Sequence, residues 1–457
     1  MKSYHNIITQ KLGIDKSVFY TLLGRGLQIP VALGMIFFIA HYLSAVEQGF
    51  YYTFNSIVAL QVFFELGLTS IITQFVAHEA SHLQWDGKKF IGEEIYRSRL
   101  ASLLKFCFKW YMIFAAMILC TLLIIGIYFF SKYDNQNENI KWTLPWILLS
   151  IGTAFNFLVA PINSILQGLG NIERMAKISF LQMLMRPIIL WGGFMLGLNL
   201  YVLGLDALLK ATLLCVFVAK SSMSKMLLSL WKEKITQIIS YKNEILPLQW
   251  RIAVSWISGY FIFQLFNPVL FATEGAKVAG QMGLTLQALN SIQALAMSWI
   301  STKIPIMSNF IALKKYNQLD NLFNRVFKQV LFIGIILIIS FIIIIHIMDE
   351  YQINPLGIKL SDRFLPLLPL TLMSIAIFTT IPVNCWAAYL RGHKKEPLMV
   401  NSVVMGLLCC CSTFILGRIY GLIGITCGFT ILQIISSIWI KHVFITKKQQ
   451  WHYDKNI

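Results

Sequence analysis

Charged side chains are scarce in this chain. Only 13% of its 457 residues are charged and 57% are hydrophobic, whereas soluble domains contain about 25% charged residues. Such a composition excludes an ordinary water-soluble domain. The apolar residues occur in runs of roughly 18 to 27, and about 20 apolar residues in a helix span the hydrocarbon core of a bilayer. The sequence therefore predicts an all-α integral membrane protein.

Motifs for metals, cofactors and disulfides are also scarce. Most of the eight cysteines lie within apolar runs, where cysteine behaves as a small apolar residue, and neither paired CxxC spacing nor a disulfide framework occurs. His78, Glu79 and His82 have the spacing of the HExxH zinc motif, but we interpret this short stretch as the solvated end of a helix rather than as a metal site. No glycine-rich phosphate-binding loop is present. We expect no metal and no cofactor.

Polar segments large enough for a catalytic domain are missing too. The longest segments expected on the outer side, 131–141 and 349–363, are too short to build an active site. Membrane-bound polymerases, ligases and glycosyltransferases usually present their acids, bases or metal ligands on larger loops. The sequence therefore predicts that the protein is not an enzyme.

The apolar runs predict about twelve transmembrane helices. The expected spans are 18–40, 49–75, 106–130, 143–167, 178–198, 202–220, 250–272, 278–301, 327–348, 364–390, 398–417 and 420–440. Most of the 38 lysines and arginines fall in segments that share one side of the membrane, and basic residues accumulate on the cytoplasmic side. Both termini are therefore expected in the cytoplasm. The net charge of +18 needs no nucleic-acid partner, since the basic residues lie in short loops.

The longest polar interruption lies at 221–249. Its apolar residues recur at helical spacing opposite lysines, which predicts an amphipathic helix on the inner membrane surface. This segment divides the chain into two halves of about six spans, as in transporters built from repeats. We expect an N-terminal six-helix lobe over 1–220, an inter-lobe helix over 221–249, and a C-terminal six-helix lobe with a short cytoplasmic tail over 250–457.

Ionisable residues inside the spans are candidate functional residues, because each costs about 2.5 kcal/mol or more at bilayer depth and normally faces a wet cavity or a bundle interior. Arg25 lies between two glycines early in the first span. Its side chain either extends to the inner membrane interface or binds a ligand. Glu65 lies deep in the second span, and a structural and a functional role are both open. Arg186 precedes Pro187, so its guanidinium suits either a carbonyl freed by the proline or a substrate.

Three further charges lie in the sixth and seventh spans. Asp206 and Lys210 are four residues apart and can pair on one helix face, which favours a structural role. Arg251 opens the seventh span, whose Ser258 and Gln264 make it polar enough to line a cavity.

Two stretches resemble Wzx-type polysaccharide flippases. The first runs from Leu43 to Leu68 and includes Glu47-Gln48-Gly49. The second combines 249–253, Gln-Trp-Arg-Ile-Ala, with 258–261, Ser-Gly-Tyr-Phe. With the span count, the likeness extends over nearly the whole chain, although the specific motifs occupy a small part of it.

The resemblance implies two six-helix lobes around a central cavity. It also implies a cargo, an oligosaccharide of O-antigen or a related surface polysaccharide on undecaprenyl pyrophosphate. This cargo would move from the cytoplasmic to the periplasmic leaflet of a bacterial inner membrane. Expected partners are the lipid-linked oligosaccharide, membrane lipids, a polysaccharide polymerase and a chain-length regulator. The chain lacks the two extra C-terminal helices of the lipid II flippase, which argues against a peptidoglycan cargo.

In proteins of this kind cationic cavity residues meet the pyrophosphate. The resemblance implies this role for Arg25 and Arg251, and position alone adds Arg186 and Lys210. The acidic residues, Glu65 and Asp206, would either couple transport to protons or sodium or serve the structure.

Two alternatives stay open. A multidrug or cation antiporter of the same superfamily would prefer acidic cavity residues, and the first and eighth predicted spans contain no carboxylate. A membrane-embedded enzyme of polysaccharide assembly is disfavoured by the short loops.

Overall fold

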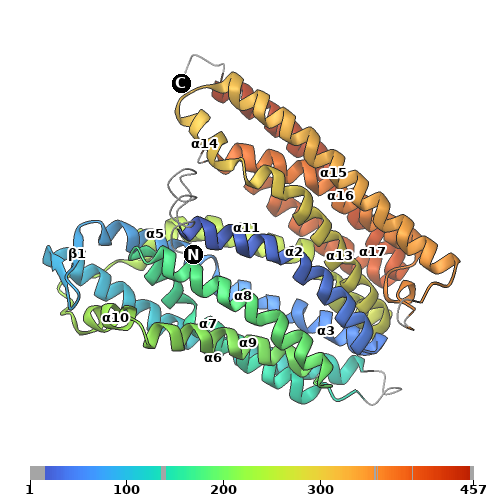
Figure 1. The fold of residues 1–457 in the computed structure, drawn as a ribbon, viewed down its shortest axis with the longest axis horizontal. Helices are drawn as coiled ribbons and strands as arrows, with labels where there is room; N and C mark the ends of the chain where they lie inside the picture. The colour runs from blue at the N-terminus through green and yellow to red at the C-terminus, as the bar shows by residue number, and fades with distance from the viewer. Residues whose placement is uncertain (1–15, 135–139, 355–356, 358, 394, 453–457) are drawn as a thin grey trace, which may run out of the picture. The chain divides into compact units, whose positions relative to one another are not determined.

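The computed structural model describes residues 16–134, 140–354, 357, 359–393 and 395–452; in the first helix it does not describe the side chains of 16–19, 21–26, 28 and 29. The described chain consists of helices, loops and one small β-hairpin (Figure 1). The all-α architecture predicted from the sequence is confirmed.

The helices of the first half are α2 (Lys16–Tyr42), α3 (Ala45–Val58), α4 (Val62–Glu65), α5 (Leu68–Ala80), α6 (Glu94–Tyr133), α7 (Thr143–Gly168), α8 (Ile172–Met195), α9 (Tyr201–Ala219) and α10 (Ser222–Lys232). The second half contains the π-helix η2 (Tyr241–Ile245), α11 (Leu246–Phe263), α12 (Phe266–Thr273), α13 (Ala276–Ser301), α14 (Ile304–Ala312), α15 (Tyr316–Glu350), the 3-10 turn η4 (Ser361–Arg363), α16 (Leu367–Arg391) and α17 (Met399–His452). A second 3-10 turn, η1 (Ala59–Gln61), joins α3 to α4.

Most of these helices can cross a bilayer. Among the described residues, eight helices are long and apolar enough to do so, or nine if the bent pair Ala45–Glu65 and Leu68–Ala80 forms one span. The 54-residue α17 is interrupted at Gly421, where φ is 57° and ψ is −136°, so it contains two of the predicted spans. α13 is too polar for the same criterion, since glutamines and serines recur along it. With α2 and α13 added, the helices coincide with all the predicted spans, and the chain is a multi-pass membrane protein.

The described chain folds into two compact units. Unit 1 comprises 16–31, 60–132 and 140–253, and unit 2 comprises 32–59 and 254–452 with the short piece 133–134. Residues 32–59, which we expected in the N-terminal lobe, thus pack with the second half of the chain.

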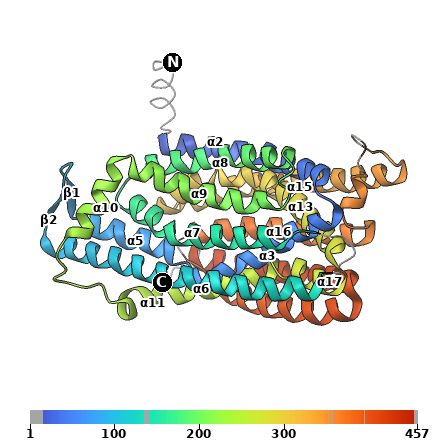
Figure 2. The same cartoon turned by 90° about the horizontal axis from the view of Figure 1, so that it is seen from below.

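Unit 1 is organised around α7 and α9, which lie side by side (Figures 1 and 2). An apolar cluster that includes Val159, Leu166 and Leu214 holds α7, α8 and α9 together. At the other end of α7, the fully buried Trp146 donates its indole N–H to the carbonyl of Leu122 at 3.1 Å. Burial of such apolar side chains stabilises the unit.

A break between α4 and α5 interrupts the second predicted span. Leu66 and Gly67 both adopt left-handed backbone conformations, with φ of 50° and 69°. A leucine in this region is uncommon, and such backbone is tolerated at membrane depth only where protein or a wet cavity satisfies its polar groups. The break places Glu65 and Thr69 on one side of unit 1.

The segment 221–249 is only partly helical. α10 covers Ser222–Lys232 and buries Met223, Met226 and Leu230. Beyond it the backbone N–H groups of Thr236 and Gln237 donate to the Ser98 hydroxyl at 2.7 and 2.8 Å, in place of carbonyls of the same helix. This exchange of partners explains why the expected helix ends early.

A hairpin of β1 (Leu83–Trp85) and β2 (Phe90–Gly92) lies beside α10 at one end of unit 1 (Figures 1 and 2). In its turn the backbone amides of Lys89 and Lys88 donate to the Asp86 carboxylate, both at 2.7 Å. These hydrogen bonds lower the pKa of Asp86. The turn is thus closed locally, without help from the helices.

Unit 2 contains a close helix pair, α3 on α13. A Cβ atom at Gly49 would stand 1.9 Å from the Ala276 carbonyl oxygen, so no side chain fits there. The buried Gln48 donates to the carbonyl of Gly280 at 2.8 Å, and the Tyr52 hydroxyl donates to Gln287 at 2.7 Å. Small residues let helix backbones approach in this way in membranes.

Candidate functional site

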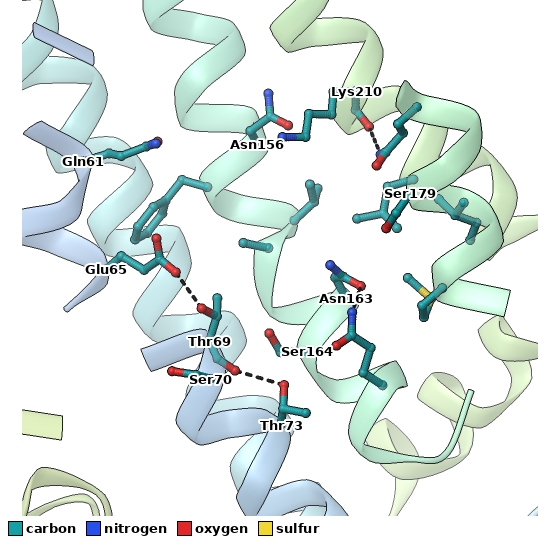
Figure 3. Close-up of a pocket in the computed structure, with 18 residues that line it drawn as sticks. Gln61, Glu65, Thr69, Ser70, Thr73, Asn156, Asn163, Ser164, Ser179 and Lys210 are labelled. Atoms are coloured by element: carbon teal, nitrogen blue, oxygen red, sulfur yellow. Dashed lines mark hydrogen bonds between the residues drawn. The ribbon is translucent and has the colours of Figure 1, made fainter. Parts of the chain in front are cut away.

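A polar cavity opens inside unit 1, between α5, α7, α8 and α9. Its volume is about 400 Å³. We call it the Glu65 cavity, because Glu65 is the acidic residue in its wall (Figure 3). Its other polar wall residues are Gln61, Thr69, Ser70, Thr73, Asn156, Asn163, Ser164, Gln167, Ser179, Gln182 and Lys210.

Helical spacing explains why these side chains converge. Asn156, Asn163 and Gln167 are seven and four residues apart, which places them along one face of α7. Thr69 and Thr73 repeat this on α5 at a spacing of four. Each helix therefore turns a polar stripe towards the cavity and its apolar faces elsewhere.

Some of the wall groups are already paired. The Thr69 hydroxyl donates to the Glu65 carboxylate at 2.6 Å, and the Gln167 amide donates to Asn163 Oδ1 at 2.9 Å (Figure 3). The Gln182 amide donates to the carbonyl of Lys210 at 2.8 Å. These bonds hold the carboxylate and the amides in fixed orientations.

Other wall groups remain available to a bound molecule. The described part of the structure gives no hydrogen-bond partner to the side chains of Gln61, Ser164 and Ser179. Leaving polar groups unpaired in a dry apolar interior costs free energy. The cavity is therefore expected to hold water or a polar ligand.

A second cavity of about 470 Å³ adjoins the first. It shares Asn163, Ser179, Gln182 and Lys210 with the Glu65 cavity, and we call it the Arg186 cavity. Arg186 Nε lies 3.4 Å from Asp206 Oδ2. The Arg186 side chain is 58% exposed and the Asp206 side chain only 19%, so the guanidinium has room for a second partner.

Four of the six predicted site residues come together in these two cavities. Glu65, Arg186, Asp206 and Lys210 all line one or both of them. The pairing of Asp206 with Lys210 that we predicted from their spacing is replaced by the ion pair with Arg186, which reaches across from α8. A neighbouring helix can offer a better partner than the same helix face does.

The other two predicted residues lie elsewhere. Arg251 is exposed near the start of α11, with its guanidinium 5.6 Å from the ring centre of Trp250, and it lines neither cavity. Arg25 belongs to α2, but its side chain lies outside the described residues. The role predicted for these two arginines stays a prediction.

Sequence reasoning missed the uncharged members of the site. Asn156, Asn163, Gln167 and Gln182 carry no charge, so the search for ionisable residues in spans passed over them. The signal that would have found them is the recurrence of amides on one helical face within an apolar run. Polar stripes, more than single charges, define this site.

The first stretch that resembles Wzx-type flippases has a structural role in unit 2. Its Ser44 and Glu47 form a capping box at the start of α3, and Gln48, Gly49 and Tyr52 build the contact with α13. The Arg363 guanidinium adds a hydrogen bond to the Leu43 carbonyl at 2.8 Å. The beginning of this stretch therefore encodes helix packing, whereas Gln61 and Glu65 near its end line the Glu65 cavity.

Comparison with known proteins places this fold in a class. No family model matches the chain, and no curated protein matches it. Solved structures do match, and the fold is that of multi-pass membrane transporters. A multidrug resistance MATE family transporter of the MOP superfamily, inward-facing, matches with a TM-score of 0.61 at 13% identity, over 93% of this chain and 99% of that one.

Two other solved structures have the same fold. The lipid II flippase MurJ, in an inward closed conformation, matches with a TM-score of 0.59 at 14% identity, over 95% of this chain and 89% of that one. An outward-facing MATE transporter gives a TM-score of 0.53 at 14% identity, over 95% and 96% of the two chains. The structural likeness establishes the fold. Because the sequence identities are this low, it leaves the cargo open.

Proposed function

We propose that the chain is a flippase for undecaprenyl-pyrophosphate-linked oligosaccharide units of O-antigen or a related surface polysaccharide. It moves them from the cytoplasmic to the periplasmic leaflet by alternating access. The observation that carries this proposal is the pair of adjoining polar cavities with arginine, lysine and amide side chains in their walls. The fold shared with a lipid II flippase supports it.

The chemistry of the cargo explains why such cavities are needed. A pyrophosphate and hydroxylated sugars find no hydrogen bonds in hydrocarbon, and their transfer there is costly. Arg186 presents a planar fork of donors that binds phosphate oxygens bidentately and stays charged. Lys210 adds a second cation to the same cavity. The lipid tail can stay in the bilayer while the polar head passes.

Within this proposal the basic residues Arg25, Arg251, Arg186 and Lys210 act on the substrate. Glu65 and Asp206 either couple transport to an ion or orient the cationic groups. The Arg186–Asp206 ion pair favours the second role for Asp206. Polymerase and chain-length regulator partners belong to the proposal as well.

A multidrug or cation antiporter is the second candidate. Two carboxylates in the cavity walls, Glu65 and Asp206, and the MATE fold favour it. The same walls contain Arg186 and Lys210, which would repel an organic cation. In the described residues no cluster of His, Cys, Asp and Glu could hold a metal ion, so a metalloenzyme finds no support there.

The proposed orientation in an inner membrane has both termini in the cytoplasm. Reporter fusions after Gly87, Lys234 and Lys315 should then read as cytoplasmic, and a fusion after Asn354 as periplasmic, because basic residues resist translocation. Paired alkaline phosphatase and fluorescent-protein reporters measure this. A cytoplasmic reading after Asn354 would contradict the orientation.

Deleting the gene tests the flippase activity itself. Complete lipid-linked units should be assembled and then accumulate facing the cytoplasm, because the later enzymes act on the periplasmic leaflet. A membrane-impermeant sugar-specific probe, applied to cells and to inside-out vesicles, measures where the units lie. A transferase would leave truncated units, and a drug exporter would leave the units unchanged and alter drug sensitivity. Normal periplasmic exposure without a redundant flippase would rule the proposal out.

A further inference from the structure

Resting on the proposed function, we infer a division of labour between the two cavities. The Glu65 cavity is the subsite for one uncharged sugar residue of the lipid-linked unit, and the Arg186 cavity receives the pyrophosphate. Neither the fold nor the resemblance assigns the amide and hydroxyl residues of the Glu65 cavity to any ligand.

Charge separates the two ends of the substrate. In one cavity Glu65 accepts a hydrogen bond from the Thr69 hydroxyl, and an acidic side chain in the wall disfavours a pyrophosphate there. Lys210 lines both cavities and each cavity has one acidic residue, Glu65 or Asp206, but Arg186 lines only the second cavity, which therefore holds one more cation. Like charges repel strongly in a medium of low dielectric constant. The anionic end of the substrate is therefore stabilised in the Arg186 cavity.

Hydrogen-bonding capacity suits the Glu65 cavity to a sugar. Each sugar hydroxyl both donates and accepts, and the wall offers both kinds of group. Glu65 has acceptor oxygens for a sugar hydroxyl beyond its bond from Thr69. Ser164 and Ser179 have hydroxyls without protein partners among the described residues, and Asn163 has amide N–H groups beyond its bond from Gln167. The ring of Phe157 supplies one apolar surface.

The two cavities are contiguous, which a single substrate requires. Asn163, Ser179, Gln182 and Lys210 line both of them, so a molecule that occupies both passes these four side chains. A volume of about 400 Å³ lies at the small end of the range of ligand pockets. It has room for one sugar ring and bound water, so the remaining sugars of the unit must lie outside it.

Binding of two probes to the full chain in lipid nanodiscs tests this division. The probes are undecaprenyl pyrophosphate and undecaprenyl pyrophosphate carrying one N-acetylhexosamine, with affinities measured by native mass spectrometry. Two or three added hydrogen bonds should make the glycosylated lipid bind about tenfold more tightly. Gln61→Leu, at a residue that lines the Glu65 cavity and not the Arg186 cavity, should lower this ratio and leave binding of the bare lipid unchanged. Arg186→Ala should weaken both lipids.

Gln318→Leu is the matched control, since it removes an exposed amide from α15 in unit 2 and should keep the ratio. If Gln61→Leu lowers the unfolding temperature, Ser164→Ala, which also lies only in the wall of the Glu65 cavity, provides the same test with a smaller change. Equal binding of both probes by the wild type would overturn the sugar subsite and leave the flippase standing. A ratio kept by folded Gln61→Leu and Ser164→Ala would also overturn it. If neither probe binds to the wild type, the flippase proposal itself is contradicted.

Discussion

Replacing Gly49 with alanine is expected to destabilise the protein by about 1–3 kcal/mol, the range of overpacking in a close-packed interior. The added Cβ would stand 1.9 Å from the Ala276 carbonyl oxygen, and backbone cannot move aside as a flexible side chain can. The hydrogen bond from Gln48 to Gly280 would lengthen as the helices separate. Thermal unfolding of the detergent-solubilised protein measures the loss.

Gly192→Ala is the matched control for Gly49→Ala. Gly192 is also a helical glycine, but a Cβ there would meet nothing within 4 Å. Alanine in an exposed helix interior is favoured over glycine by about 0.5–1 kcal/mol, so this variant should be unchanged or slightly more stable. Equal stability of the two variants would show that α3 and α13 do not approach this closely.

The spans of this fold could be predicted because apolar runs carry their own signal. The break at Leu66 and Gly67 could not, because the run of apolar residues continues through it and only the backbone dihedrals reveal it. The placement of 32–59 in unit 2 was equally hidden. It depends on contacts such as Gln48 with Gly280, which are 232 residues apart in sequence.

The charged part of the site could be predicted, since charges in spans are rare and costly. The partners of these charged residues could not be predicted. The i, i+4 rule pointed to Asp206 with Lys210, yet α8 brings Arg186 to Asp206. The amides of Asn163 and Gln167 escaped notice because a single neutral residue in a span gives no signal until its helical face is known.

Arg186→Ala is expected to lower transport at least tenfold and up to about a hundredfold. A charge-assisted hydrogen bond contributes about 1.5–3 kcal/mol, and every 1.4 kcal/mol corresponds to a factor of ten. Asp206→Asn should keep most of the activity, because the amide oxygen can still accept from the guanidinium. Restoration of surface polysaccharide in a deletion strain measures transport, and immunoblots of the membrane fraction check the amount of protein.

The double variant Arg186→Ala, Asp206→Asn distinguishes a substrate role for Arg186 from a purely structural one. If Arg186 only neutralises Asp206, removing both charges leaves no unpaired carboxylate, and the double variant should regain activity. If Arg186 binds the pyrophosphate, the double variant should be as defective as Arg186→Ala alone. The Arg186 side chain is 58% exposed, although its Nε lies 3.4 Å from Asp206 Oδ2. A guanidinium whose only role is to pair with this carboxylate does not need such exposure, which favours the second outcome. Recovery of transport in the double variant would remove Arg186 from the substrate site.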